Sequence, residues 1–142
     1  MKYTEIEVVN LLYQTISQSV LYTDSKKPNG QLCKYERIDN SVLEDTVING
    51  LGVARDDVQE GVLNVNQYVP NLVYPNNPSL KSQPNTSRIA YLSNLLNKAL
   101  GEGEEFWDAS GKWCFQVQQD TVMPDTNNQH YINFRVEFYL NN

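Results

Sequence analysis

The sequence has few of the side chains on which most active sites and metal sites depend. Its 142 residues include one histidine and two cysteines, which excludes a histidine-rich metal site, a zinc ribbon and a small disulfide-stapled fold. No stretch approaches the roughly 20 apolar residues of a membrane span, and the first residues lack the apolar core of a signal peptide. We therefore expect synthesis in a reducing cytoplasm and no contact with a membrane.

Basic side chains are also scarce, since 11 Lys and Arg stand against 17 Asp and Glu. The net charge of -6 and the pI of about 4.7 argue against a protein whose main task is to bind phosphate backbones. The hydrophobic share is 40%, and the 7 glycines bring the apolar total to about 45%. That share is ordinary for one folded domain of this length, and we expect a single domain over residues 1–142.

Two segments have the pattern of amphipathic helices. The first opens with Thr4-Glu5-Ile6-Glu7, which has the form of a capping box. Its apolar residues then recur every three or four positions over about 17 residues, at Ile6, Val9, Tyr13, Ile16 and Val20. The second helix is expected to follow Thr86 or Ser87 and to end before Gly101. Its apolar face consists of Ile89, Leu92, Leu95, Leu96, Ala99 and Leu100.

Five segments favour strands, because apolar and polar residues alternate in them or β-branched residues cluster between turn formers. They cover residues 32–38, 44–49, 61–70, 113–118 and 131–140. Residues 120–128, which include Pro124, are expected to be a polar connection. Cys33 and Cys114 both fall in these strands and could approach each other, although free thiols are favoured in a reducing compartment.

The element order α-β-β-β-α-β-β predicts an α+β fold. Short links pair neighbouring strands antiparallel, and two helices with one apolar stripe each must both bury that stripe. We expect a single antiparallel sheet of about five strands with two α-helices on one face. The opposite face of that sheet is rich in Asn, Gln and Tyr, and it is either solvated or a contact surface.

Residues 70–85 hold four prolines and four asparagines, which exclude regular structure. Long loops of this kind are usually functional or mobile. This loop also carries apolar side chains that need a surface of the domain itself or of a neighbour, and Phe106 and Trp107 stand out in the same way in an acidic loop. The predicted partner contacts are Leu72, Val73, Tyr74, Leu80, Phe106 and Trp107.

An active site is not expected. His130 is the single candidate for an acid or base near neutral pH, and no Ser or Cys stands in a recognisable nucleophile context. Cys114 and His130 could meet across a hairpin, but no neighbouring residue activates the thiol. The acidic groups around Asp56 and Glu104 have no metal-ligand spacing and are typical of solvated loops. We therefore expect no enzymatic activity, no cofactor and no bound metal.

Three stretches resemble the tail-terminator or tail-completion family of tailed bacteriophages. They are Glu-Asp-Thr-Val-Ile-Asn at 44–49, Gly-Val-Leu-Asn-Val-Asn-Gln-Tyr-Val-Pro at 61–70, and Asn-Gln-His-Tyr-Ile-Asn-Phe-Arg-Val at 128–136. Together with the order of helices and strands, the resemblance covers nearly the whole chain. The chain departs from the family in its longer loop at 70–85 and in the loop that carries Phe106 and Trp107.

The resemblance implies a virion protein at the head–tail junction, made in the host bacterial cytoplasm. Such a protein forms a ring of subunits, six in tail terminators, that caps the tail tube, contacts the neighbouring neck and tube proteins and lets DNA pass. Six copies of this chain would carry about -36, and an acidic lumen would repel DNA and keep it from adhering. The residues expected to line such a lumen are Asp56, Asp57, Glu60, Glu104 and Glu105.

Three alternatives stay open at this point. The chain could be another neck component, such as an adaptor or head-completion ring of twelve subunits. It could be a small cytoplasmic enzyme that uses Cys114 and His130, or a monomeric binding module with a solvated polar sheet face. Oligomeric state and symmetry would distinguish these classes most directly.

Overall fold

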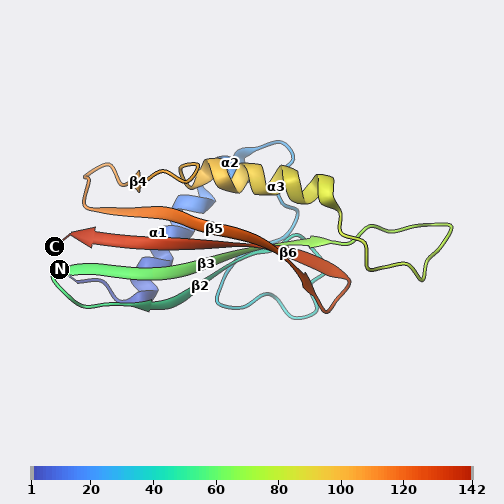
Figure 1. The fold of residues 1–142 in the computed structure, drawn as a ribbon, viewed down its shortest axis with the longest axis horizontal. Helices are drawn as coiled ribbons and strands as arrows, with labels where there is room; N and C mark the ends of the chain where they lie inside the picture. The colour runs from blue at the N-terminus through green and yellow to red at the C-terminus, as the bar shows by residue number, and fades with distance from the viewer. Residues whose placement is uncertain (1, 142) are drawn as a thin grey trace.

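The structure, a computed structural model, describes residues 2–141. Within that range six strands form one sheet in the order β1-β2-β3-β6-β5-β4 (Figure 1). The strands are β1 (Leu32–Lys34), β2 (Thr46–Val53), β3 (Val58–Pro70), β4 (Phe106–Trp107), β5 (Trp113–Asp125) and β6 (Gln129–Asn141). The helices are α1 (Glu5–Ser17), α2 (Val20–Thr23) and α3 (Thr86–Ala99).

The centre of the sheet consists of three antiparallel strands of 13 residues each, β3, β6 and β5. β6 pairs with β3 along its whole length, from Gln129 opposite Pro70 to Asn141 opposite Val58. Its alternation is complete, with Ile132, Phe134, Val136, Phe138 and Leu140 all buried. The alternating pattern therefore predicted the orientation of this strand correctly.

Both long helices pack on that apolar face. Their buried side chains join those of β3 and β6 in one core, to which α1 contributes Val8, Val9, Leu12 and Ile16 and α3 contributes Ile89, Leu92, Leu95, Leu96 and Ala99. The prediction of one sheet with two helices on a single face is confirmed in outline. None of the helices in residues 2–141 is long and apolar enough to cross a membrane.

The prediction of about five strands, all antiparallel, is wrong in two details. β1 pairs with β2 in parallel, with Cys33 opposite Val47. The 11 residues between these strands are long enough to return the chain to the same end of the sheet, which two-residue hairpin turns cannot do. β4 is the second difference, a two-residue edge strand whose Phe106 pairs with Phe115.

The first helix is shorter than the predicted 17 residues. Its capping box is present, since the Thr4 amide donates to Glu7 Oε1 at 3.0 Å and the Glu7 amide donates to Thr4 Oγ1 at 3.3 Å. The helix ends at Ser17, because Ser19 adopts an extended conformation and its hydroxyl caps the separate short helix α2. The buried face of the helix also differs from the predicted apolar stripe, because Ile6, a member of that stripe, is 46% exposed.

The connection predicted at 120–128 is instead the outer half of the β5–β6 hairpin. β5 continues through Pro124 to Asp125, and a bulge between Val117 and Gln119 shifts the register by one residue. Beyond the bulge the side chains are mostly exposed, Val122 included. Composition alone predicts a loop there. The segment is a strand because it pairs with β6, and not because its side chains are buried.

An ion pair between Arg88 and Glu44 joins the start of α3 to the chain just before β2. Arg88 donates through Nε and Nη2 to the two carboxylate oxygens of Glu44 at 2.7 and 2.8 Å, and Nη2 also reaches the Lys27 carbonyl at 3.1 Å. The Glu44 side chain is largely buried. Its charge therefore depends on this two-point contact for compensation.

We predict that Arg88→Ala lowers the free energy of unfolding by about 2 kcal/mol, because it leaves the buried Glu44 carboxylate without a counter-charge and with the Asn29 amide as its remaining donor. Arg88→Lys should lose less, since it keeps a cation but cannot donate twice in parallel. Urea denaturation followed by circular dichroism measures both. A value for Arg88→Ala within about 0.5 kcal/mol of the unmodified protein would contradict this role.

Candidate interaction surfaces

Residues 71–85, here called the arm, project from the end of the sheet where β3 stops and the β5–β6 hairpin turns (Figure 1). Backbone hydrogen bonds give the arm a defined shape. The Leu72 amide donates to the Gln83 carbonyl at 2.9 Å, which closes its base. Two successive turns follow, Asn77 N to Tyr74 O and Leu80 N to Asn77 O, both at 3.0 Å. The loop has no helix or strand, as predicted, but it folds back on itself.

The base of the arm is fixed by Asn71. Its side-chain amide donates from Nδ2 to the Lys81 carbonyl at 2.8 Å, and its backbone amide donates to the Asn128 carbonyl at 2.9 Å. Its Oδ1 lies 2.6 Å from His130 Nδ1, so that nitrogen is the donor of the pair. The one histidine of the chain thus holds the arm against the β5–β6 hairpin. Sequence reasoning missed this role, because the two residues are 59 positions apart.

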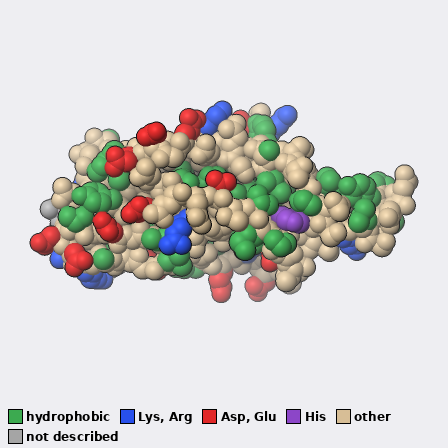
Figure 2. Space-filling view, in the orientation of Figure 1, with side chains coloured by type: hydrophobic (Ala, Val, Ile, Leu, Met, Phe, Trp, Pro, Cys, Tyr) green, Lys and Arg blue, Asp and Glu red, His purple; other side chains and the backbone are tan. Residues whose placement is uncertain are grey.

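The predicted contact residues Leu72, Val73, Tyr74 and Leu80 all lie on the arm. Val73 is 83% exposed, and Leu72 and Tyr74 also lie open to solvent, whereas Leu80 is half-buried. Hydrophobic side chains accordingly cover much of the projecting end in Figure 2. Leu72, Val73 and Leu80 also border a hollow of about 400 Å³ at the base of the arm, together with Val42.

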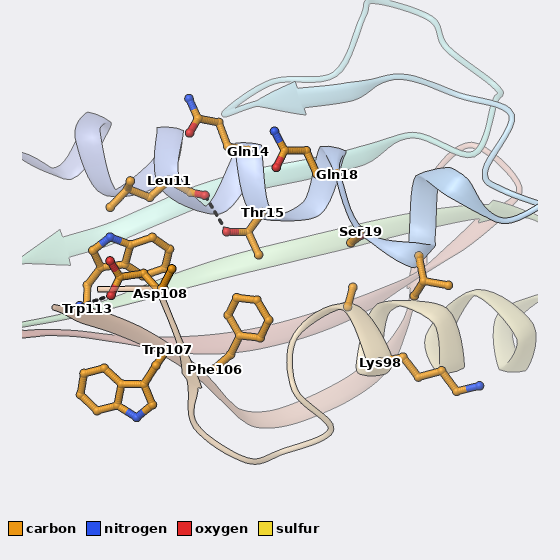
Figure 3. Close-up of a pocket in the computed structure, with 13 residues that line it drawn as sticks. Leu11, Gln14, Thr15, Gln18, Ser19, Lys98, Phe106, Trp107, Asp108 and Trp113 are labelled. Atoms are coloured by element: carbon orange, nitrogen blue, oxygen red, sulfur yellow. Dashed lines mark hydrogen bonds between the residues drawn. The ribbon is translucent and has the colours of Figure 1, made fainter. Parts of the chain in front are cut away.

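Phe106 and Trp107, also predicted as partner contacts, point to opposite sides of the sheet. Neighbouring residues of a strand alternate between its faces. The Trp107 indole packs edge-on against Tyr139 on the outer face, with ring centres 6.1 Å apart. Phe106 instead points toward the helices (Figure 3). The two rings therefore point to opposite sides of the sheet, although both residues line the groove described next.

Phe106 faces a groove between α1 and the chain around β4 (Figure 3). The groove has a volume of about 550 Å³. One wall is formed by Leu11, Gln14 and Thr15 on α1 and by its C-cap residue Gln18. The other wall includes Phe106, Asp108 and Trp113. The groove is also lined by Ser19, Val20, Trp107 and Ala109, and by Lys98 and Ala99 at the end of α3. We call these residues the groove.

Asp108 shapes the turn beside this groove. Its Oδ1 accepts hydrogen bonds from the backbone amides of Lys112 at 2.6 Å and Trp113 at 3.1 Å, and its Oδ2 accepts one from the Ser110 hydroxyl. The Ser110 hydrogen bond first, and then the backbone amides, hold the pKa of the Asp108 carboxyl below its usual value. Asp108 therefore stays ionised and positions Trp113. Its place at the head of Asp-Ala-Ser-Gly is a turn signal that the sequence interpretation overlooked.

The acidic residues predicted to line a lumen lie at the end of the sheet away from the arm. Asp56 and Asp57 lie in the turn before β3, Glu60 lies opposite Tyr139, and Glu104 and Glu105 precede β4. The sheet brings both groups to this end. Tyr139, the partner of Glu60, also pairs with Cys114 on β5, and Cys114 pairs with Trp107 on β4, which directly follows Glu104 and Glu105 in the chain. All five side chains are exposed, and acidic groups gather at this end in Figure 2. Their place in a lumen stays a prediction.

The structure separates Cys114 from His130. Cys114 pairs with Tyr139, nine residues along β6 from His130, which is on the order of 30 Å. Burial, with the nearby charges of Glu105 and Glu137, raises the pKa of the Cys114 thiol. The alternative in which Cys114 and His130 act together as a nucleophilic pair is therefore wrong. Both cysteines are free, since β2, β3 and β6 lie between their strands.

Among residues 2–141, no group of three or more His, Cys, Asp and Glu side chains is arranged to hold a metal ion. Neither a protein-family model nor a curated protein matches the sequence. The fold and surfaces define a class, a single-sheet α+β domain with a projecting apolar arm at one end and exposed acidic residues at the opposite end. Any narrower assignment is a proposal.

We predict that Asn71→Ala loosens the arm without unfolding the domain, because it removes the side-chain bonds to Lys81 and His130. Exchange of the Leu72 amide should become roughly tenfold faster in hydrogen–deuterium exchange, while amides in β6 stay protected. His130→Ala, which removes one of the two bonds, should have a smaller effect. Unchanged exchange at Leu72 in Asn71→Ala would show that the base of the arm does not depend on this residue.

Proposed function

We propose that the chain is a structural virion protein of a tailed phage. In this proposal copies of the chain assemble into a ring at the head–tail junction, which terminates the tail tube and lets DNA pass. The observation that carries the proposal is the arm, where a hydrogen-bonded loop holds Leu72, Val73 and Tyr74 in contact with water. Exposed apolar side chains in an ordered segment gain free energy when they are buried by association.

The outer face of the sheet supports a role in contact rather than in chemistry. Many of its side chains are amides and aromatics that contact one another, together with the charged Arg135 and Glu137. Asn133 Nδ2 donates to Asn66 Oδ1 at 2.7 Å, and the ring centres of Tyr68 and Tyr131 are 5.2 Å apart. Arg37 stacks over Tyr68 at 3.9 Å. With several of its polar groups already bonded to one another, this face suits a surface along which another molecule lies or slides.

The location in a virion rests on the resemblance to tail terminators, and the charge agrees with it. Six copies would carry about -36, which suits a passage that DNA crosses without adhering. We propose that Asp56, Asp57, Glu60, Glu104 and Glu105 line that passage. An alternative within the same virion is a twelve-subunit adaptor or head-completion ring, which electron microscopy of the assembled ring would distinguish by its symmetry.

Deletion of residues 72–82 should leave the domain folded and abolish its assembly. The cut ends can be joined, because the amide of Leu72 lies 2.9 Å from the carbonyl of Gln83 at the base of the arm. Removal of the arm takes no buried residue from the core. Light scattering after size exclusion should report one subunit mass for the deletion variant, and circular dichroism should report an unchanged fold.

A pair of point variants separates loss of the arm from loss of its apolar surface. Val73→Asp places a charge at its most exposed apolar position and should also give monomers, whereas Ser79→Asp adds the same charge at an exposed polar position and should assemble normally. Ring formation by the deletion variant, or by Val73→Asp at unchanged concentrations, would contradict the proposed role of the arm.

A further inference from the structure

We propose that the arm of one copy docks into the groove of the next copy. This inference rests on the proposed function, that copies of the chain assemble, and it names the two surfaces that meet. The arm contributes Leu72, Val73 and Tyr74. The groove receives them between the α1 row at Leu11 and Thr15 and the aromatic side chain of Phe106.

The two surfaces lie at different places along the molecule. The arm extends from one end of the long axis, whereas β4 lies toward the other (Figure 1). The groove lies beside β4, since Phe106 and Trp107 line it. The arm of a subunit therefore does not reach its own groove. A contact between two different surfaces of the same chain is heterologous, and repetition of such a contact gives a closed ring or an open filament.

The chemistry of the groove suits the arm. Half-buried Leu11, Phe106 and Trp113 provide an apolar floor, and the exposed amides of Gln14 and Gln18 lie along its margin. Those amides can bond to the backbone of the arm, in which prolines leave carbonyls without helix or sheet partners. The volume of about 550 Å³ lies within the range of cavities that enclose compact ligands.

Charge complementarity also favours this occupant. Lys81 is the one charged residue in 71–85, whereas residues 101–108 carry four carboxylates and no basic side chain. Asp108 forms part of the groove wall itself, and Lys98 lies on the wall at the end of α3. The arm is therefore expected to enter with Lys81 toward Asp108 and away from Lys98.

The hollow at the base of the arm is a less suitable receptor. Exchange of arms between two such hollows would form a symmetric dimer. Lys81 lines that hollow together with Asn71, Asn127 and Asn128, and no carboxylate lines it. Two lysines would then approach each other without a counter-charge, whereas Asp108 in the groove supplies a negative charge for Lys81.

Complementation between two variants tests the docking directly. Thr15→Arg fills the groove and adds a cation on an α1 surface where arginine is a good helix former, so the fold should persist. Val73→Asp damages the arm and leaves the groove intact. Each variant alone should be monomeric at concentrations where the unmodified protein assembles, with association weakened by roughly tenfold or more.

Mixed in equal amounts, the two variants should form a 1:1 heterodimer and nothing larger. The intact arm of Thr15→Arg can occupy the intact groove of Val73→Asp, while neither remaining surface can continue the chain. Native mass spectrometry of an isotope-labelled mixture would identify that species. Thr15→Ser and Ser79→Asp are the matched controls and should assemble like the unmodified protein, and Leu11→Glu provides a second groove variant.

The possible failures are distinguishable. If the unmodified protein assembles and both groove variants assemble equally well, the docking inference is wrong and the proposed ring stands. If Val73→Asp is monomeric but the mixture stays monomeric, the arm binds another surface and the inference is again wrong. If the unmodified protein is monomeric at every concentration, both the inference and self-assembly as proposed are contradicted.

Discussion

The register of the three long antiparallel strands determines where every candidate surface lies. β3, β6 and β5 pair over almost their whole length, so their alternation gives one apolar face to both long helices and one polar face to the outside. The same ladder sets the ends of the molecule. Pro70 opposite Gln129 places the arm beside the β5–β6 hairpin, and Val58 opposite Asn141 places the acidic turn at the far end. A shift of one residue would exchange the two faces.

Much of this arrangement could be predicted from local patterns. Strict alternation identified β6, and the spacing of apolar residues with a capping box identified α1 and α3. The failures occurred where a non-local contact decides the structure. The outer half of β5 is exposed on both faces and is a strand only because β6 pairs with it. The parallel pairing of β1 and the two-residue strand β4 likewise depend on partners distant in sequence, which composition cannot reveal.

The candidate surfaces could likewise be predicted where local sequence determines them and not where distant segments meet. Four apolar residues in a proline-rich loop indicated the arm, and the structure places them together on it. The anchor at its base escaped prediction, since Asn71 and His130 meet only after β3 and β6 have paired. Phe106 and Trp107 were both predicted as partner contacts, and the strand that holds them turns their rings to opposite faces. The groove is assembled from α1, α2, α3 and the turn around Asp108, so no single segment signals it.

The central proposal is that this chain works by fitting against copies of itself. Sedimentation velocity of the unmodified protein over a wide range of concentrations tests it most directly. The account predicts one closed species whose mass is a fixed multiple of 16.3 kDa, six in the tail-terminator arrangement. A single subunit mass at all concentrations, or a dimer that grows no further, would contradict it.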